Sequence, residues 1–234
     1  MEQHHHSQHQ NGLQNHNLNN EINVSASYKD NLITISIENI NDIKTPIKLV
    51  KNHEKFMHLI IVSEDLKDFF HLHPRKVDAN HFEQEINLSN EKKYKAFVDI
   101  IVEGKDYVIK PIAINSSNKN EQKSPLKLDT LNKKEIQGYH IEMEHGHFMV
   151  KKTIELKFKI KNAIPDPYLG ALGHVVIIDE QAEKFIHVHP ISNNETIFET
   201  QFEKAGIYKL WAEFKFGQDI IAFPYVFSVT ETLH

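Results

Sequence analysis

Cysteine is absent from this 234-residue chain. Its absence excludes disulfide bonds, thiol catalysis, cysteine-ligated zinc, iron–sulfur clusters and copper sites that need a thiolate. Any transition-metal site must therefore use histidine, methionine or carboxylate side chains. Long apolar runs are absent as well: no stretch reaches the ~18 residues that a membrane-spanning helix needs, so we expect no membrane span.

An excess of positive charge is also lacking. The chain has 27 Lys and Arg residues against 32 Asp and Glu, a net charge of −5 and a pI near 6.4, which argues against nucleic acid or an acidic membrane as the main partner. The first residues, Met-Glu-Gln-His-His-His, have neither the basic nor the apolar region of a signal peptide. We therefore expect a cytoplasmic protein. An extracytoplasmic location is the alternative if a leader has been removed.

Histidine, by contrast, is abundant, with 17 residues, and six of them belong to a segment that the chain contains twice. The copies run from His58 to Pro74 and from His174 to Pro190. In each, a histidine is followed thirteen residues later by a second, two residues further by a third, and then by proline. The six histidines are His58, His71, His73, His174, His187 and His189.

Residue alternation with a period of two surrounds both copies and predicts β-strands. Residues 1–20 are polar and rich in His, Asn and Gln, which is typical of a disordered, loosely metal-binding tail. The strand order of the first half recurs in the second, so we predict an all-β fold of two similar β-sandwiches in series. The expected divisions are a tail at 1–20, a first sandwich at 21–116, a linker at 117–134 and a second sandwich at 135–234.

The repeated segment is predicted to be a β-hairpin with a four-residue loop, Glu64 to Lys67 in the first copy. This register places His58 opposite His73, and His71 shares their face because side chains alternate along a strand. The same count places His174 opposite His189, with His187 beside them. Each copy thus presents three imidazoles on one sheet face, a set that suits Cu(II) or Zn(II).

Other histidines and methionines give weaker signals. Met143, His145, His147 and Met149 lie on or near the first strand of the second half and are of a type used as copper ligands. His53, His81, His140 and His234 are interpreted as lone surface or core residues. A structural role for the repeated histidines remains open, in which they bond backbone groups across the two sandwiches and fix the pair of domains.

The same motifs carry a resemblance to a group of bacterial proteins, mostly exported and poorly characterised, from about residue 21 to the end. The shared segments are Met57-His58-Leu59, Asp65-Leu66, His71-Leu72-His73-Pro74, Pro167 to His174, and His187-Val188-His189-Pro190. Members of this group are often described as secreted or heavy-metal-associated. The resemblance implies an immunoglobulin-like or cupredoxin-like architecture and favours copper. The chain differs from the exported pattern in lacking a leader, and it adds the His-rich tail.

These observations lead to one function hypothesis and two alternatives. The leading hypothesis is a metal-binding protein, for copper or alternatively zinc, that sequesters or transfers the ion, with His58, His71 and His73 as one site and His174, His187 and His189 as the other. The alternative is a non-catalytic interaction module with structural histidines and an unknown protein partner. A metalloenzyme is disfavoured, because no motif supplies a general base beside either trio.

Overall fold

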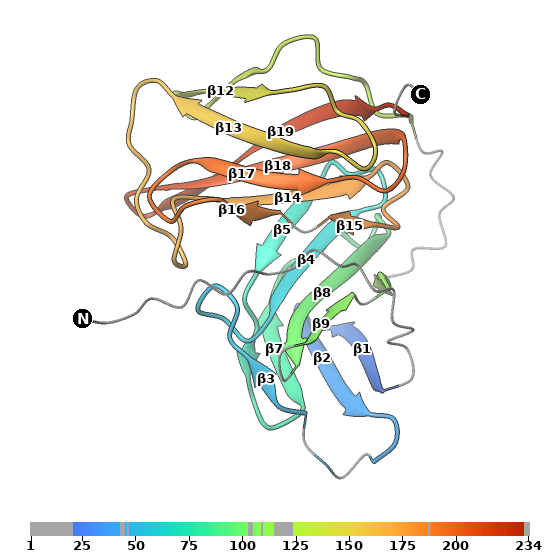
Figure 1. Ribbon diagram of the computed structural model, residues 1–234. Helices are drawn as coiled ribbons and strands as arrows, with labels where there is room; N and C mark the ends of the chain where they lie inside the picture. The colour runs from blue at the N-terminus through green and yellow to red at the C-terminus, as the bar shows by residue number, and fades with distance from the viewer. Residues whose placement is uncertain are drawn as a thin grey trace, which may run out of the picture.

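The fold is all-β, as predicted. The computed structural model describes residues 21–42, 45, 47–102, 105–108, 110–114, 124–186 and 188–231, and for 105–108 and His189 the backbone only. In this part of the chain every regular element is a β-strand, and two β-sandwiches follow one another in sequence (Figure 1). The described residues form no helix long and apolar enough to cross a membrane. The predicted tail, residues 1–20, lies outside the described residues.

The first sandwich is built from alternating sequences that place one row of side chains in the core. One sheet has the order β1-β2-β7-β6. The other has the order β10-β8-β4-β5, with β3 and β9 also paired to β8. The strands are β1 (Ile22–Lys29), β2 (Leu32–Asn39), β3 (Leu49–Val50), β4 (His58–Ser63), β5 (Phe69–Leu72), β6 (Arg75–Lys76), β7 (His81–Glu85), β8 (Tyr94–Val102), β9 (Lys105–Val108) and β10 (Ile112–Ile114).

The second sandwich repeats this plan with longer final strands. Its sheets have the orders β11-β12-β13-β17-β16 and β15-β14-β18-β19. The strands are β11 (Lys133–Ile136), β12 (Tyr139–His145), β13 (Thr153–Ile160), β14 (His174–Asp179), β15 (Phe185–Ile186), β16 (His189–Pro190), β17 (Ile197–Gln201), β18 (Gly206–Phe216) and β19 (Asp219–Val229).

The segment before β11 is hydrogen-bonded to the second sandwich. The backbone N–H of Asp129 donates to the carbonyl of Val226 at 2.9 Å, and the N–H of Val226 donates to the Asp129 carboxylate at 2.8 Å. The expected linker at 117–134 is thus bound to β19 at Asp129, and its last two residues, Lys133 and Lys134, are the first of β11. Residues 115–123 are outside the described residues.

Both repeated segments form the predicted hairpins. In the first, β4 pairs with β5 in a register that sets Leu59 opposite Leu72 and Ile60 opposite His71, and the N–H of Ser63 donates to the carbonyl of Asp68 at 3.2 Å. In the second, Ile177 lies opposite Ile186. Continued by one residue, the first register places His58 opposite His73, as the sequence predicts.

After each hairpin the chain crosses from one sheet of its sandwich to the other. β5 belongs to the sheet of β4, whereas β6 pairs with β7 in the facing sheet. The second copy makes the same crossing, but there Pro190 lies within β16, opposite Phe198. β16 is an edge strand of its sheet, where the missing N–H of a proline is tolerated.

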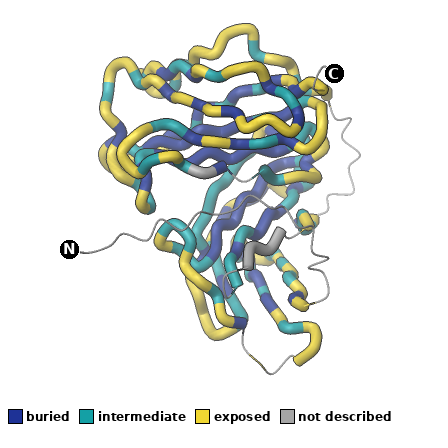
Figure 2. Tube along the Cα trace, viewed as in Figure 1, coloured by how far each residue is buried: buried dark blue, intermediate teal, exposed yellow. Residues whose placement is uncertain are grey.

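Each sandwich has its own apolar core, and a third apolar cluster joins the two sandwiches. Strands β4 and β14 are buried along almost their whole length (Figure 2), because one face of each packs into its own sandwich and the other against the partner sandwich. The two repeats make equivalent contacts there: the rings of Phe69 and Trp211 stack with centroids 4.6 Å apart, and those of their counterparts Phe185 and Phe97 lie 6.2 Å apart. The buried residues of this cluster are Ile60, Val62, Leu66, Phe97, Val176, Ile178, Ala182 and Trp211.

The residue before each hairpin differs in size between the two copies, and a neighbouring side chain fills the difference. Met57 is buried in the first core, on the face opposite His58, whereas the corresponding Gly173 leaves room for the ring of Phe214. A Cβ at position 173 would lie 2.6 Å from the Phe214 ring and 2.9 Å from the carbonyl oxygen of Glu213. Gly173 is therefore a packing requirement of the site described below.

Substitution of Gly173 by alanine is expected to destabilise the protein by about 1–3 kcal/mol, as overpacking of a filled core does. Urea unfolding of Gly173→Ala against the parent measures this change. Gly146→Ala is the matched control, because no atom lies within 4 Å of a Cβ at that position. Equal unfolding free energies for Gly173→Ala and the parent would contradict the packing role.

Candidate metal centre

Each hairpin is preceded by the same tight turn, although the two turn sequences differ. Asn52 and Lys55 exchange backbone hydrogen bonds of 2.8 and 3.0 Å, and Tyr168 and Ala171 exchange bonds of 2.7 and 3.3 Å. Both central residues of each turn have positive φ, 46° at His53 and 80° at Gly170 among them. Each turn directs a carbonyl at a histidine: Nε2 of His58 lies 3.0 Å from the oxygen of Asn52, and Nε2 of His174 lies 3.0 Å from that of Tyr168.

His58, His71 and His73 come together as the sequence predicts. One ring nitrogen from each can be chosen so that all three lie within 4.8 Å of one another. His58 Nδ1 and His71 Nε2 are 3.1 Å apart, close to the spacing of about 3.3 Å between two ligands of a tetrahedral ion with bonds of 2.0–2.1 Å. Three imidazoles converging in this way can bind a metal ion.

In two of these rings, the nitrogen that does not face the other histidines, here called the outer nitrogen, is hydrogen-bonded to an oxygen atom. Because a carbonyl oxygen only accepts, Nε2 of His58 donates to Asn52, and Nδ1 keeps its lone pair towards His71. Nδ1 of His71 donates to Oε2 of Glu213 at 2.5 Å, where the side chains are only 4% and 8% exposed. Such bonds orient a ligating histidine and increase its basicity. Glu213 belongs to the second sandwich, so this bond also joins the two domains.

The third histidine supplies a buried nitrogen with no partner. Nε2 of His73 is inaccessible and accepts or donates no hydrogen bond among the described residues. An unpaired buried polar atom costs about 1–3 kcal/mol, so native proteins rarely keep one without a use. A metal ion at the trio would give this nitrogen a partner.

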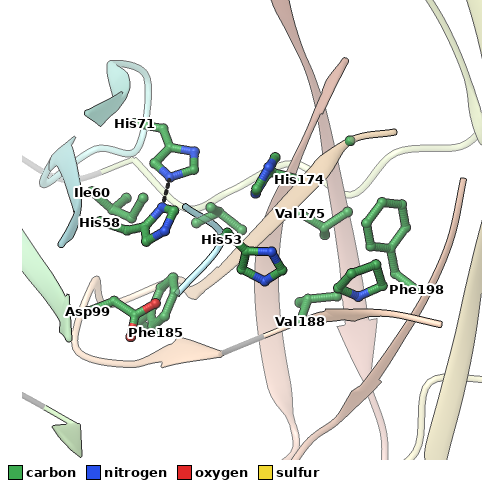
Figure 3. A pocket seen from close by; sticks show the side chains of 13 residues that line it. His53, His58, Ile60, His71, Asp99, His174, Val175, Phe185, Val188 and Phe198 are labelled. Atoms are coloured by element: carbon green, nitrogen blue, oxygen red, sulfur yellow. Dashed lines mark hydrogen bonds between the residues drawn. The ribbon is translucent and has the colours of Figure 1, made fainter. Parts of the chain in front are cut away.

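The second sandwich adds His174 to the cluster. Its ring centroid lies 5.8 Å from that of His71 and 6.2 Å from that of His58. His53 lies 5.3 Å from His174 and 6.1 Å from His58, so the sequence interpretation of His53 as a lone residue is wrong. The rings of His53, His58, His71 and His174 line part of a cavity of about 40 Å³ at the domain interface (Figure 3). A water needs about 10–15 Å³ on this measure, so the space suits an ion with one or two small ligands.

Burial favours the neutral form of three histidines of the cluster, His58, His73 and His174. Desolvation lowers the pKa of His58 to about 4, against a weaker opposing effect of its bond to Asn52. Desolvation likewise lowers the pKa of His174 to about 3 and that of His73 to about 2, and the electrostatic effect of the neighbouring His71 lowers both further. A neutral imidazole is the form that binds metal, so at these three rings protons compete with an ion only in acid.

These pKa shifts predict acid destabilisation of the metal-free protein. The unfolded chain binds protons at His58 and His174 below pH 6.5 while the folded chain does not, so stability is complete above that pH and is lost as pH falls towards about 4 and 3. The two residues together give a slope of about 2.5 kcal/mol per pH unit near pH 5. Urea unfolding in EDTA between pH 7.5 and 4.5 measures it, and a free energy that stays constant from pH 6.5 to 5 would contradict it.

The second predicted trio is described only in part. Of this trio, His174 lies beside the rings of His58 and His71. His187 is outside the described residues, and the side chain of His189 is not described. The backbone of His189 pairs with Glu199 in β17.

The residues around β12 do not form the ligand set that their composition suggests. Met143 is buried in the second core. His145 is already satisfied: its Nδ1 donates to the carbonyl of Gly146 at 2.6 Å, and Nε2 accepts from the Asn132 amide at 3.0 Å. His147 and Met149 line a surface groove with it.

The sequence analysis did not identify two acidic residues of the site, because neither belongs to a recognisable motif. Asp99 lies opposite His58 on β8, and Glu213 lies opposite His174 on β18. They are therefore equivalent positions of the two repeats, each directly across from the first histidine of a hairpin. An alignment of β8 with β18, made together with the hairpins, would have identified this pair of carboxylates. It would not have shown that Glu213 contacts the ring of His71.

Comparison with known proteins gives a family and a distant likeness. None of the curated proteins compared with the chain matches it. Solved structures that match include the FN1–FN3 domains of chicken CNTN1, with 9% identity over 90% of this chain and 67% of that one, at a TM-score of 0.27. A two-domain fibronectin type III segment of chicken tenascin matches with 11% identity over 88% of this chain and 98% of that one, at a TM-score of 0.29.

A family described as "Domain of unknown function (DUF8832)" matches residues 9–115 and 134–231. This description names no metal and no compartment, so the resemblance to exported, heavy-metal-associated proteins stays a prediction. The matched residues include both hairpins, the turns before them and the strands that carry Asp99 and Glu213. The chain belongs to the DUF8832 family.

Proposed function

We propose that this protein binds one transition-metal ion, copper in preference and zinc as the alternative, and sequesters it or passes it on. His58, His71 and His73 are the proposed ligands. The observation that carries the proposal is their convergence, with ring nitrogens within 4.8 Å of one another and the outer nitrogens of His58 and His71 held by Asn52 and Glu213. The proposed role is binding and transfer, with no catalytic step.

The donor set favours copper over zinc on chemical grounds. All three ligands are imidazoles, which suit both ions, and Cu(II) binds a given nitrogen site more tightly than Zn(II) when geometry does not discriminate. The three nitrogens lie within 4.8 Å of one another, and two ligands of a bound ion lie about 3.3 Å apart. Ring rotations on the order of 1 Å would bring them to the bond lengths of either metal.

Elemental analysis of the full chain, purified without a tag, tests the proposal. After loading with copper or zinc and dialysis, we expect one tightly held ion per chain. The tail histidines His4, His5, His6, His9 and His16 also bind metals in principle, so a variant with all five replaced by asparagine is the control. Tight binding that disappears in this control would place the ion in the tail and reject the site.

A second role is favoured by one contact. The bond between His71 and Glu213 joins the two sandwiches without any ion, which fits a non-catalytic interaction module with structural histidines. Thermal unfolding separates the two roles, because an ion bound only by the folded chain stabilises it by about 2.7 kcal/mol at one hundred times its Kd. A melting temperature that is unchanged by copper, zinc and chelator would favour the structural role.

A further inference from the structure

We propose that His174 is a fourth ligand of the ion held by His58, His71 and His73, so that the ion bridges the two sandwiches. This inference rests on the proposed function and adds to it a ligand from the second domain. It makes the interface between the sandwiches, rather than the first hairpin alone, the metal site.

The spacing of the four rings supports a common centre. In a tetrahedral site with bonds of 2.0–2.1 Å, ring centroids of neighbouring histidine ligands lie about 5 Å apart, and up to about 6 Å as the angle between them opens. The first three rings are 5.4, 4.9 and 4.8 Å apart. The ring of His174 is 5.8 Å from His71 and 6.2 Å from His58. The distance to His71 falls within this range, and the distance to His58 exceeds it by a few tenths of an ångström, so a small shift of the His174 ring is needed to reach the common centre.

The tautomer of His174 leaves one ring nitrogen, Nδ1, free to bind a metal ion. Nε2 donates to the carbonyl of Tyr168, as Nε2 of His58 donates to that of Asn52. In both rings Nδ1 then keeps a lone pair. The bond to Tyr168 is also an outer bond of the kind that fixes the orientation of a metal-bound histidine. His58 and His174 hold the same place in the two repeats and share one pattern of fixation.

The position of His174 is held rigidly by its surroundings. β14 is paired with β18 along its length, with His174 opposite Glu213, and Gly173 packs against Phe214. The cavity between the two hairpins is lined by His58, His71 and His174 together (Figure 3). The His174 side chain therefore loses little conformational freedom when it binds an ion, which keeps the entropic cost of binding low.

Electron paramagnetic resonance of the Cu(II)-loaded full chain, with the tail histidines replaced by asparagine, counts the nitrogen ligands. We expect four coupled imidazole nitrogens at one copper per chain, and three in His174→Gln, with affinity lower by roughly 100-fold because one of four ligands is lost. His147→Gln is the matched control, since His147 is exposed at the groove beside β12, and it should leave both values unchanged.

The outcomes separate the two proposals. Four nitrogens that fall to three in His174→Gln support the bridging ligand. Three nitrogens in the parent, or a count and affinity unchanged in His174→Gln, would overturn it while the first trio stands. No copper held by the tail-substituted chain rejects the proposed function itself. If His174→Gln does not fold, X-ray absorption of the copper-loaded parent still gives the number of imidazoles.

Discussion

Replacing His71 and His73 together by glutamine is expected to abolish tight metal binding. Structural zinc sites with four ligands provide about 10–16 kcal/mol, which is roughly 3 kcal/mol per ligand, so the loss of two ligands should weaken binding by on the order of 10⁴-fold. Glutamine keeps a donor for Glu213, whose carboxylate would otherwise be left buried without its partner. Calorimetric titration with Cu(II) and Zn(II) should show the loss of one equivalent.

The control for this pair is His145→Gln with His147→Gln, which removes two histidines from the groove beside β12 and leaves the interface intact. Its titration should match that of the parent. Unchanged stoichiometry and affinity in the His71 and His73 double variant would reject the assignment of the trio. A loss in both double variants would indicate that the tight site lies elsewhere.

Replacing Trp211 by alanine is expected to destabilise the protein by about 3–5 kcal/mol, the range for removing a large aromatic side chain from a packed core. Trp211 is 3% exposed, stacks on Phe69 of the other sandwich and belongs to the cluster that joins the domains. Its strand also carries Glu213, so metal affinity should fall together with stability. Urea unfolding and a copper titration of the same variant measure both effects.

A surface substitution provides the comparison. Ile164 is 88% exposed, and Ile164→Ala should change the unfolding free energy by less than about 0.5 kcal/mol, as surface changes usually do. If Trp211→Ala costs less than about 1 kcal/mol, the interface contributes little to stability. In that case the two sandwiches would have to be held together by other contacts.

The face on which the three histidines lie could be predicted because strand alternation and a short hairpin loop are local properties. The count from His58 to His73 fixes which residues are opposite, and the chain length between them leaves one simple loop. The buried runs His58 to Ser63 and His174 to Asp179 also carried a further signal, because continuous apolar strands are typical of sheets covered on both faces. That signal indicated a covered face, but not what covers it.

The sequence by itself determined the all-β class, the tandem repeat and the trio of His58, His71 and His73 on one sheet face, since these follow from periods and spacings within a few residues. Only the tertiary structure decided that this face meets the second sandwich, and with it the contacts of Glu213, His174 and His53. Glu213 is far from His71 in the chain, and no local pattern links them. The docking of two finished sandwiches through equivalent apolar strands brings them together.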